Sequence, residues 1–248
     1  MHKGIRLFLD TADTQQWEHW LPTGLFYGVT TNPQCMLERS QVTCSVEQLK
    51  ALANQAFALK AKEVQLQTWG TTVDSLVKTG KLLAEIDERV VVKVPITKVG
   101  TEAASKLIAE GIRVTLTGVY AIHQVLIATA SGADYVAPYL GRINDLGRNG
   151  LEDLAAMQLA NVGVGGATRI LVASIRSVDD IVLLATQGLD TFTFSPLKTC
   201  IIVLIYFSIF LFCFRIQPIP KTPKSNTCAR RKLGSGTDID FNEAVPLY

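Results

Sequence analysis

Short apolar runs alternate with longer amphipathic stretches along most of the chain. A run of roughly four to eight apolar or β-branched residues predicts a buried strand, and a longer amphipathic stretch predicts a helix. Strands are expected over residues 5–10, 28–33, 63–67, 90–97, 112–117, 133–139, 169–174 and 190–194. Helices are expected over residues 14–20, 46–60, 73–86, 101–110, 120–130, 151–160 and 178–186, with loops at 141–150 and 163–167. This alternation predicts an α/β fold, a (β/α)8 TIM barrel.

The strand over residues 90–97 contains a single lysine, Lys93, in an otherwise apolar run that ends near a proline. Alternation places Val91, Lys93 and Pro95 on one face. A strand proline is best tolerated at the strand end, so Lys93 should lie near the carboxyl end, where barrel active sites form. Burial disfavours a charged amine, and a neutral amine attacks carbonyl carbon. The alternative is a lysine that extends to water.

Polar side chains stand at or just beyond the carboxyl ends of seven of these strands. In a closed barrel those ends meet at one mouth, so the sequence predicts a site there. The residues are Asp10, Asn32, Gln67, Lys93, Thr117, Tyr139 and Ser174.

Composition and charge fit a cytoplasmic enzyme better than a nucleic-acid-binding protein. The chain has 248 residues, 48% of them hydrophobic, and a net charge of +2. Residues 1–197 carry 17 Lys and Arg against 19 Asp and Glu, and residues 198–248 carry 7 against 3, so the main body offers no basic stripe for nucleic acid. The five cysteines include no CxxC pair, which indicates a reducing compartment. The apolar pattern begins at once, leaving no room for a signal peptide.

Six segments in order carry a resemblance to a known family: LFLDTAD, GVTTNP, VVKVPIT, EGI followed by TGVY, ADYVAPYLGRI and ILVASIRS. Over residues 5 to about 195 they resemble the transaldolase family, and most closely its small branch of fructose-6-phosphate aldolase-like and short transaldolase enzymes. The resemblance implies a class I aldolase barrel that acts on phosphorylated sugars of the pentose phosphate pathway type, with no cofactor. It also implies a homo-oligomer, which the altered end of this chain puts in question.

The resemblance implies a role for each matched residue. Lys93 would form a Schiff base with the ketone carbon of the sugar, because a protonated imine stabilises the carbanion left by carbon–carbon cleavage. Asp10 would hold hydroxyls and assist proton transfer. Thr30, Asn32 and Ser174 would bind the substrate.

Two further groups of residues would set the reaction and the substrate. Gln67, Thr117 and Tyr139 would hold a catalytic water, and the pair of Gln67 and Tyr139 is typical of the aldolase branch, whereas classical transaldolases carry Glu and Phe. A phenol beside the water favours release of free ketone. Arg142, which matches the family directly, and Arg176, which follows Ser174, would bind the substrate phosphate.

Other chemistries have little support in the sequence. His2, His19 and His123 show no metal-ligand spacing. The glycines at 163, 165 and 166 precede a strand, whereas a dinucleotide fingerprint follows one, so this segment is interpreted as a plain loop.

The family pattern ends after Phe194, where a helix covering the last strand should follow. Residues 198–216 are expected to form an apolar helix whose core, 200–214, is shorter than the roughly 20 residues of a membrane span, and residues 217–248 are expected to be disordered. The apolar segment is interpreted as a short membrane anchor, as a packing helix, or as sequence that is not normally translated; the abrupt change in composition favours the third. The chain is therefore either a Schiff-base aldolase or transaldolase, or an impaired barrel acting as a scaffold.

Overall fold

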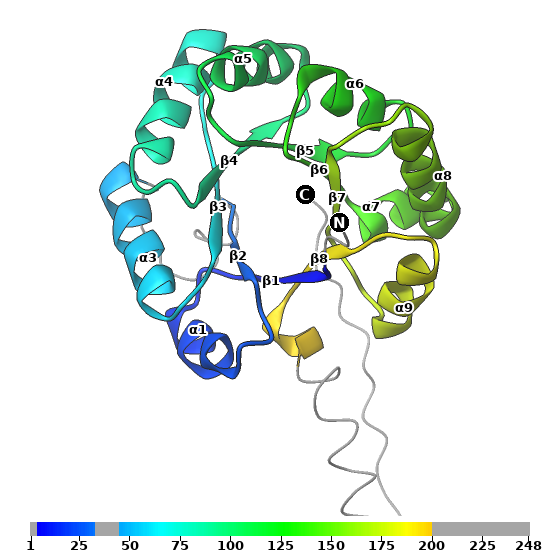
Figure 1. Ribbon diagram of the computed structural model, residues 1–248, viewed down its shortest axis with the longest axis horizontal. Coiled ribbons are helices and arrows are strands. Elements are labelled where there is room, and N and C mark those ends of the chain that lie inside the picture. Colours follow the sequence, from blue (N-terminus) through cyan, green and yellow to red (C-terminus); the bar gives the residue numbers. More distant parts are fainter. Residues whose placement is uncertain (1–3, 33–44, 200–248) are drawn as a thin grey trace, which may run out of the picture. The chain divides into compact units, whose positions relative to one another are not determined.

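The computed structural model describes residues 4–32 and 45–199, and within them it forms a closed barrel. Eight parallel strands follow one another in sequence order, and β1 (Arg6–Asp10) closes the ring by pairing with β8 (Thr191–Phe194). Figure 1 looks along the barrel and shows the helices in a ring outside the strands. The predicted (β/α)8 TIM barrel is confirmed.

The remaining strands and the helices lie close to the expected ranges. The inner strands are β2 (Gly28–Thr30), β3 (Glu63–Gln67), β4 (Val90–Pro95), β5 (Val114–Val119), β6 (Tyr135–Pro138) and β7 (Arg169–Val172). The helical elements are α1 (Thr14–Trp20), η1 (Leu21–Thr23), α3 (Val46–Ala58), α4 (Val73–Ala84), α5 (Lys98–Ala109), α6 (Gln124–Ser131), α7 (Leu140–Asp145), α8 (Gly150–Gly163) and α9 (Val178–Thr186).

Four local predictions were wrong, and a tertiary or capping contact explains two of them. Helix α6 begins at Gln124, four residues later than expected. Helix α5 begins at Lys98 because the Thr97 hydroxyl accepts a hydrogen bond from the Gly100 amide at 3.0 Å and so caps the helix. Helix α7 occupies part of the expected loop, and its first turn is fixed by a hydrogen bond from the Gly141 amide to the Ser174 carbonyl. Helix α8 runs to Gly163, into the expected glycine-rich connector.

Alternation along the strands divides the buried side chains into two cores. The outer core lies between strands and helices and contains Val90, Val92 and Val94. The inner core contains Val91 with Phe8, Tyr135, Ala137 and Leu171. Lys93 shares the parity of Val91 and is 3% exposed, so the expected facing of the lysine strand is confirmed.

The outward side chains of the first and last strands are also buried. Leu9 and Phe192 are fully buried and Phe194 is 2% exposed, and Phe194 packs against Phe26 with ring centroids 5.9 Å apart. Residues 196–199 turn into a helix after β8. Three predictions concern the end of the chain: the helix over 198–216, the membrane anchor at 200–214 and the disordered end at 217–248. Apart from positions 198 and 199, these segments lie outside the described residues. In the described residues, the helices are too short or too polar to cross a membrane.

Gly100 should be indispensable, because the helix after the lysine strand packs its backbone onto that strand. A Cβ at Gly100 would lie 1.9 Å from the Pro95 carbonyl oxygen. We predict that Gly100→Ala lowers the free energy of unfolding by about 3 kcal/mol or more, as overpacking against rigid backbone does. Urea denaturation measures the loss.

The matched control is Gly163→Ala, because a Cβ at Gly163 meets nothing within 4 Å. Removing the helix penalty of glycine should leave this variant unchanged or up to about 1 kcal/mol more stable. Equal stability of the two variants would contradict the packing of α5 on β4.

Candidate active site

The parallel strands bring the predicted site residues to one end of the barrel. Asp10, Thr30 and Gln67 are the last residues of β1, β2 and β3. Lys93 lies beside Gln67 in the strand register and is followed by only two residues of β4. Thr117 lies near the end of β5, while Asn32, Tyr139 and Ser174 follow β2, β6 and β7. All of them therefore border the carboxyl mouth that the sequence predicts.

Lys93 is a buried amine in a mainly neutral setting. It pairs in register with Gln67 on one side and Thr115 on the other. In the described part of the chain, its side chain makes no hydrogen bond or ion pair, and the interior beneath it begins with the apolar Val91. A buried lysine without a carboxylate partner is uncommon in proteins, since burial without a partner is costly. Such an amine suits nucleophilic attack better than structural pairing.

Asp10 is held by a short chain of hydroxyls. The Thr30 hydroxyl donates to the Asp10 carboxylate at 2.8 Å, and the Thr193 hydroxyl lies 2.7 Å from that of Thr30. Because Thr30 donates to Asp10, Thr193 is the donor to Thr30. Asp13 caps the amino end of α1, so the Asp10 carboxylate is not used as the helix cap and remains available at the mouth. Thr193 was missed from the sequence, although its alternation with Phe192 and Phe194 placed it inside.

Thr117 and Tyr139 form a second pair. Their hydroxyl oxygens are 3.0 Å apart, and either can donate. A register shift follows Thr117, where Gly118 takes a φ of +74° that favours glycine. The ring of Tyr120 then packs edge-on against that of Tyr139 with centroids 5.8 Å apart. The rings of Tyr120 and Tyr139 thus lie together at the mouth, and this contact was not foreseen.

Ser174 and the two arginines lie around α7. Ser174 has a φ of +56°, which is strained for a residue with a side chain and is typical of functional sites. A Cβ at Gly141 would lie 2.7 Å from Arg176 Nε and 3.1 Å from Ser174 Oγ, so the glycine permits this approach. Arg142 lies in the same helix.

Arg176 is engaged by a partner that the sequence did not reveal. Its guanidinium donates two hydrogen bonds of 2.5 Å to the Asp145 carboxylate. These bonds hold the pKa of Asp145 below its usual range, with a smaller contribution from the charge of Arg142. The arginines and Asp145 therefore form one electrostatic group beside Ser174.

The described residues contain no group of three His, Cys, Asp or Glu side chains that could hold a metal ion. The mouth instead offers an amine, a carboxylate, hydroxyls, an amide and guanidinium groups. This set can bind a polyhydroxylated carbonyl compound and attack its carbonyl carbon.

Comparison with known proteins decides the family. Residues 7–199 match the model of the transaldolase/fructose-6-phosphate aldolase family. The chain belongs to this family. The match extends slightly beyond the resemblance expected to end at about 195. Family membership supports transaldolase-like aldolase activity.

Relatives of similar length cover most of the chain. A protein of Kosmotoga olearia named probable transaldolase is 35% identical over 193 residues, 76% of this chain and 84% of the relative. Proteins of the same name from Nitrosopumilus maritimus and Hyphomonas neptunium are 34% and 33% identical, over 77% of this chain and 84% and 86% of their own lengths.

The electrostatic group around α7 can be tested by titration. Arg176 lowers the pKa of Asp145. The ion pair is therefore fully formed at pH values above the ordinary aspartate pKa, and it is lost as the pH falls through the lowered pKa of Asp145. We predict that Asp145, followed by carboxyl carbon NMR, titrates below its usual pKa and moves upward in Arg176→Gln. Arg142→Gln should raise it less. Equal shifts in the two variants would contradict the direct pairing.

Proposed function

We propose that this family member is a lysine Schiff-base aldolase acting on phosphorylated keto-sugars, with fructose 6-phosphate, dihydroxyacetone and glyceraldehyde 3-phosphate as its reactants. The single observation that carries the proposal is Lys93, a 3% exposed amine without a carboxylate partner in the described residues, placed at the barrel mouth. An amine so placed is suited to attack a ketone, and the surrounding hydroxyls are suited to a sugar.

The chemistry can be written with this chain's own residues. The Lys93 amine adds to the ketone carbon and loses water, giving a protonated imine. The neighbouring carbon–carbon bond then breaks, its electrons move to the imine nitrogen to form an enamine, and the departing hydroxyl carbon becomes an aldehyde after losing a proton. Asp10, fixed by Thr30, receives this proton directly or through water. Protonation of the enamine and hydrolysis of the imine release the ketone and free Lys93.

The fate of the enamine separates an aldolase from a transaldolase. The Tyr139 phenol, paired with the Thr117 hydroxyl at 3.0 Å, is positioned in our proposal to hold the water that protonates the enamine. This supports release of free ketone. The alternative, transfer of the dihydroxyacetone unit to a second aldehyde, is favoured by the name probable transaldolase that the relatives carry.

In our proposal, Arg142 and Arg176 bind the substrate phosphate. Asp145 occupies the Arg176 guanidinium in the absence of substrate, so a phosphate group competes with a carboxylate for bidentate hydrogen bonds. An ion pair exposed to water is weak. A dianionic phosphate can therefore replace Asp145 at Arg176 with little loss of stability.

Reductive trapping tests the proposal directly. We predict that borohydride added with fructose 6-phosphate or dihydroxyacetone inactivates the protein and leaves a reduced adduct on Lys93, located by peptide mass mapping. Lys62, which lies before β3, serves as the control lysine. A folded protein that gains no adduct at Lys93 would exclude the mechanism and leave the scaffold interpretation.

The role of Tyr139 has its own test. Tyr139→Phe should slow release of free dihydroxyacetone by on the order of 10²- to 10⁴-fold, because one positioned proton donor is lost. Transfer to an added aldehyde should fall much less. The ratio of the two rates is measured with the same substrate, with Tyr120→Phe as the matched control. A wild-type protein that transfers efficiently and releases no ketone would establish the transaldolase reaction instead.

A further inference from the structure

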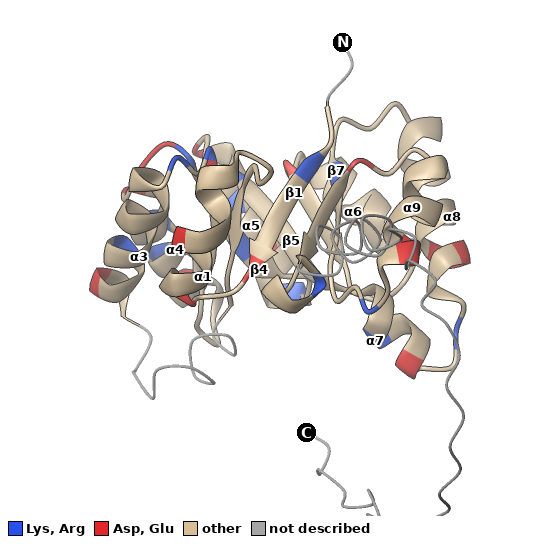
Figure 2. Cartoon of the chain, turned by 90° about the horizontal axis from the view of Figure 1, so that it is seen from below, with Lys and Arg blue, Asp and Glu red and all other residues tan. Residues whose placement is uncertain are grey.

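A cavity lies at the amino ends of the strands. Its volume is about 400 Å³, and it is lined by Arg6, Arg113, Arg169, Asp134 and Tyr135 together with small residues. Arg6 and Arg169 are the first residues of β1 and β7. Figure 2 shows the start of β1 at the opposite end of the barrel from α7. The cavity is therefore separate from the mouth that holds Lys93.

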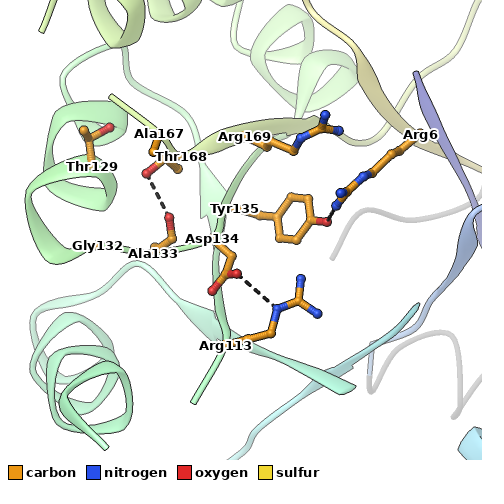
Figure 3. A pocket seen from close by; sticks show the side chains of 10 residues that line it. All are labelled: Arg6, Arg113, Thr129, Gly132, Ala133, Asp134, Tyr135, Ala167, Thr168 and Arg169. Atoms are coloured by element: carbon orange, nitrogen blue, oxygen red, sulfur yellow. Dashed lines mark hydrogen bonds and ion pairs between the residues drawn. The ribbon is translucent and has the colours of Figure 1, made fainter. Parts of the chain in front are cut away.

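Three guanidinium groups border this cavity, and their hydrogen bonding is uneven. Figure 3 shows them along one side of the cavity, flanking the Tyr135 hydroxyl. Arg113 is well paired, with 2.7 Å to Glu63 and 3.1 Å to Asp134. Among the described residues, the Arg6 guanidinium donates one hydrogen bond, to the Tyr135 hydroxyl, and lies 4.0 Å from a Glu63 oxygen that Arg113 already engages. Arg6 thus keeps donors for another acceptor.

Arg169 is the strongest indication of a ligand. Arg169 is only 8% exposed, and its Nη1 donates a hydrogen bond to the Thr191 hydroxyl at 3.0 Å. Nη2 is buried within 3.2 Å of the Asp190 carboxylate but makes no aligned hydrogen bond in the described residues. Leaving a buried charged donor unsatisfied is costly. A second acceptor would remove that cost.

The cavity has room because its other walls are small. Gly132, Ala133, Ala167 and Thr168 form them, and the Thr168 hydroxyl is already used by the Ala133 carbonyl at 2.8 Å. Burial and the charge of Glu63 raise the pKa of Tyr135, so its phenol stays protonated. The volume falls within the range of small-molecule sites.

We propose that this cavity binds a phosphate group, as inorganic phosphate or a small phosphate ester, between Arg6 and Arg169. Guanidinium groups match phosphate oxygens in geometry and charge. Asp134, Glu63 and Asp190 balance the charges of the three arginines, so in our proposal an anion is held by the remaining N–H donors of Arg6 and Arg169 rather than by net charge. The site goes beyond the proposed catalysis and does not depend on it, because Lys93 and the mouth residues take no part.

The first test changes charge at an exposed position on the cavity wall. Ala167 lines the cavity and is exposed, so substitution there leaves the buried pairs intact. Calorimetric titration of the full chain with inorganic phosphate should show a site at this cavity, in addition to any binding at the mouth arginines, in the wild type and in Ala167→Gln. Ala167→Glu, nearly the same size but negative, should bind at least about tenfold more weakly. Equal binding by the two variants would overturn the proposal, as would no binding by the wild type.

A second set of variants locates the bound phosphate. Arg6→Gln should weaken binding at least about tenfold, whereas Arg89→Gln, which removes an exposed arginine paired with Asp87 outside the cavity, should not. Arg142→Gln controls for the mouth. A signal that disappears in Arg142→Gln and persists in Ala167→Glu comes from the mouth and would overturn the proposal.

The source of the phosphate is separated by comparing two probes. If glycerol 3-phosphate binds at least about tenfold more tightly than inorganic phosphate, and this difference in affinity disappears in Ala167→Glu, the ligand is a phosphate ester. Equal affinities identify free phosphate as the ligand. Hydrogen exchange of peptides over residues 129–135 and 166–170 should slow with either probe. Unchanged exchange in both peptides would contradict binding at this cavity.

Discussion

The floor of the barrel depends on one fully buried carboxylate, Glu63. It accepts hydrogen bonds from Gln65 at 2.9 Å, Arg113 at 2.7 Å and Tyr135 at 3.1 Å. These donors come from β3, the residue before β5, and β6, so one side chain joins strands across the interior. An unpaired carboxylate there would be very costly, and removing one partner of such a group commonly costs about 3–5 kcal/mol. The barrel therefore closes around a polar network at this end rather than around hydrocarbon alone.

The network leaves the two ends of the barrel with different characters. At the amino end, opposite charges lie close together and restrain the strands. Above them lie the apolar side chains of Phe8, Val91 and Leu171, together with Gln65, whose amide oxygen accepts a hydrogen bond from the Thr115 hydroxyl at 2.9 Å. Lys93 lies beyond these side chains, on the same face of β4 as Val91, and has no carboxylate partner in the described residues. The neutral side chains of Gln65 and Thr115 thus lie between the carboxylate at the floor and the amine at the mouth, since Gln65 donates to Glu63 and Thr115 pairs in register with Lys93.

Much of this arrangement follows from the sequence because strand periodicity is strong. The run around Lys93 indicated its strand, the face that it shares with Val91 and its place near the carboxyl end, and the polar residues at the other strand ends indicated the mouth.

Contacts between residues that are distant in the sequence gave no such signal. Asp145 and Arg176 are 31 positions apart, and Thr30 and Thr193 are 163 apart. Neither pair has a local sequence pattern. Helix α7 was missed because Gly141 and its glycine-rich surroundings are typical of loops, whereas the contact with Ser174 stabilises a helical turn. The floor network was missed for the same reason, since Arg6, Arg113 and Arg169 each look like ordinary charges at a strand start.

The central claim is that the Lys93 amine becomes covalently joined to the ketone carbon, and the oxygen of that ketone reports on it most directly. Imine formation expels this oxygen as water, and hydrolysis returns one from solvent. With fructose 6-phosphate labelled with oxygen-18 at the ketone, the account predicts that released dihydroxyacetone carries solvent oxygen from the earliest times, faster than the uncatalysed exchange. Dihydroxyacetone that keeps the label while cleavage proceeds would contradict it.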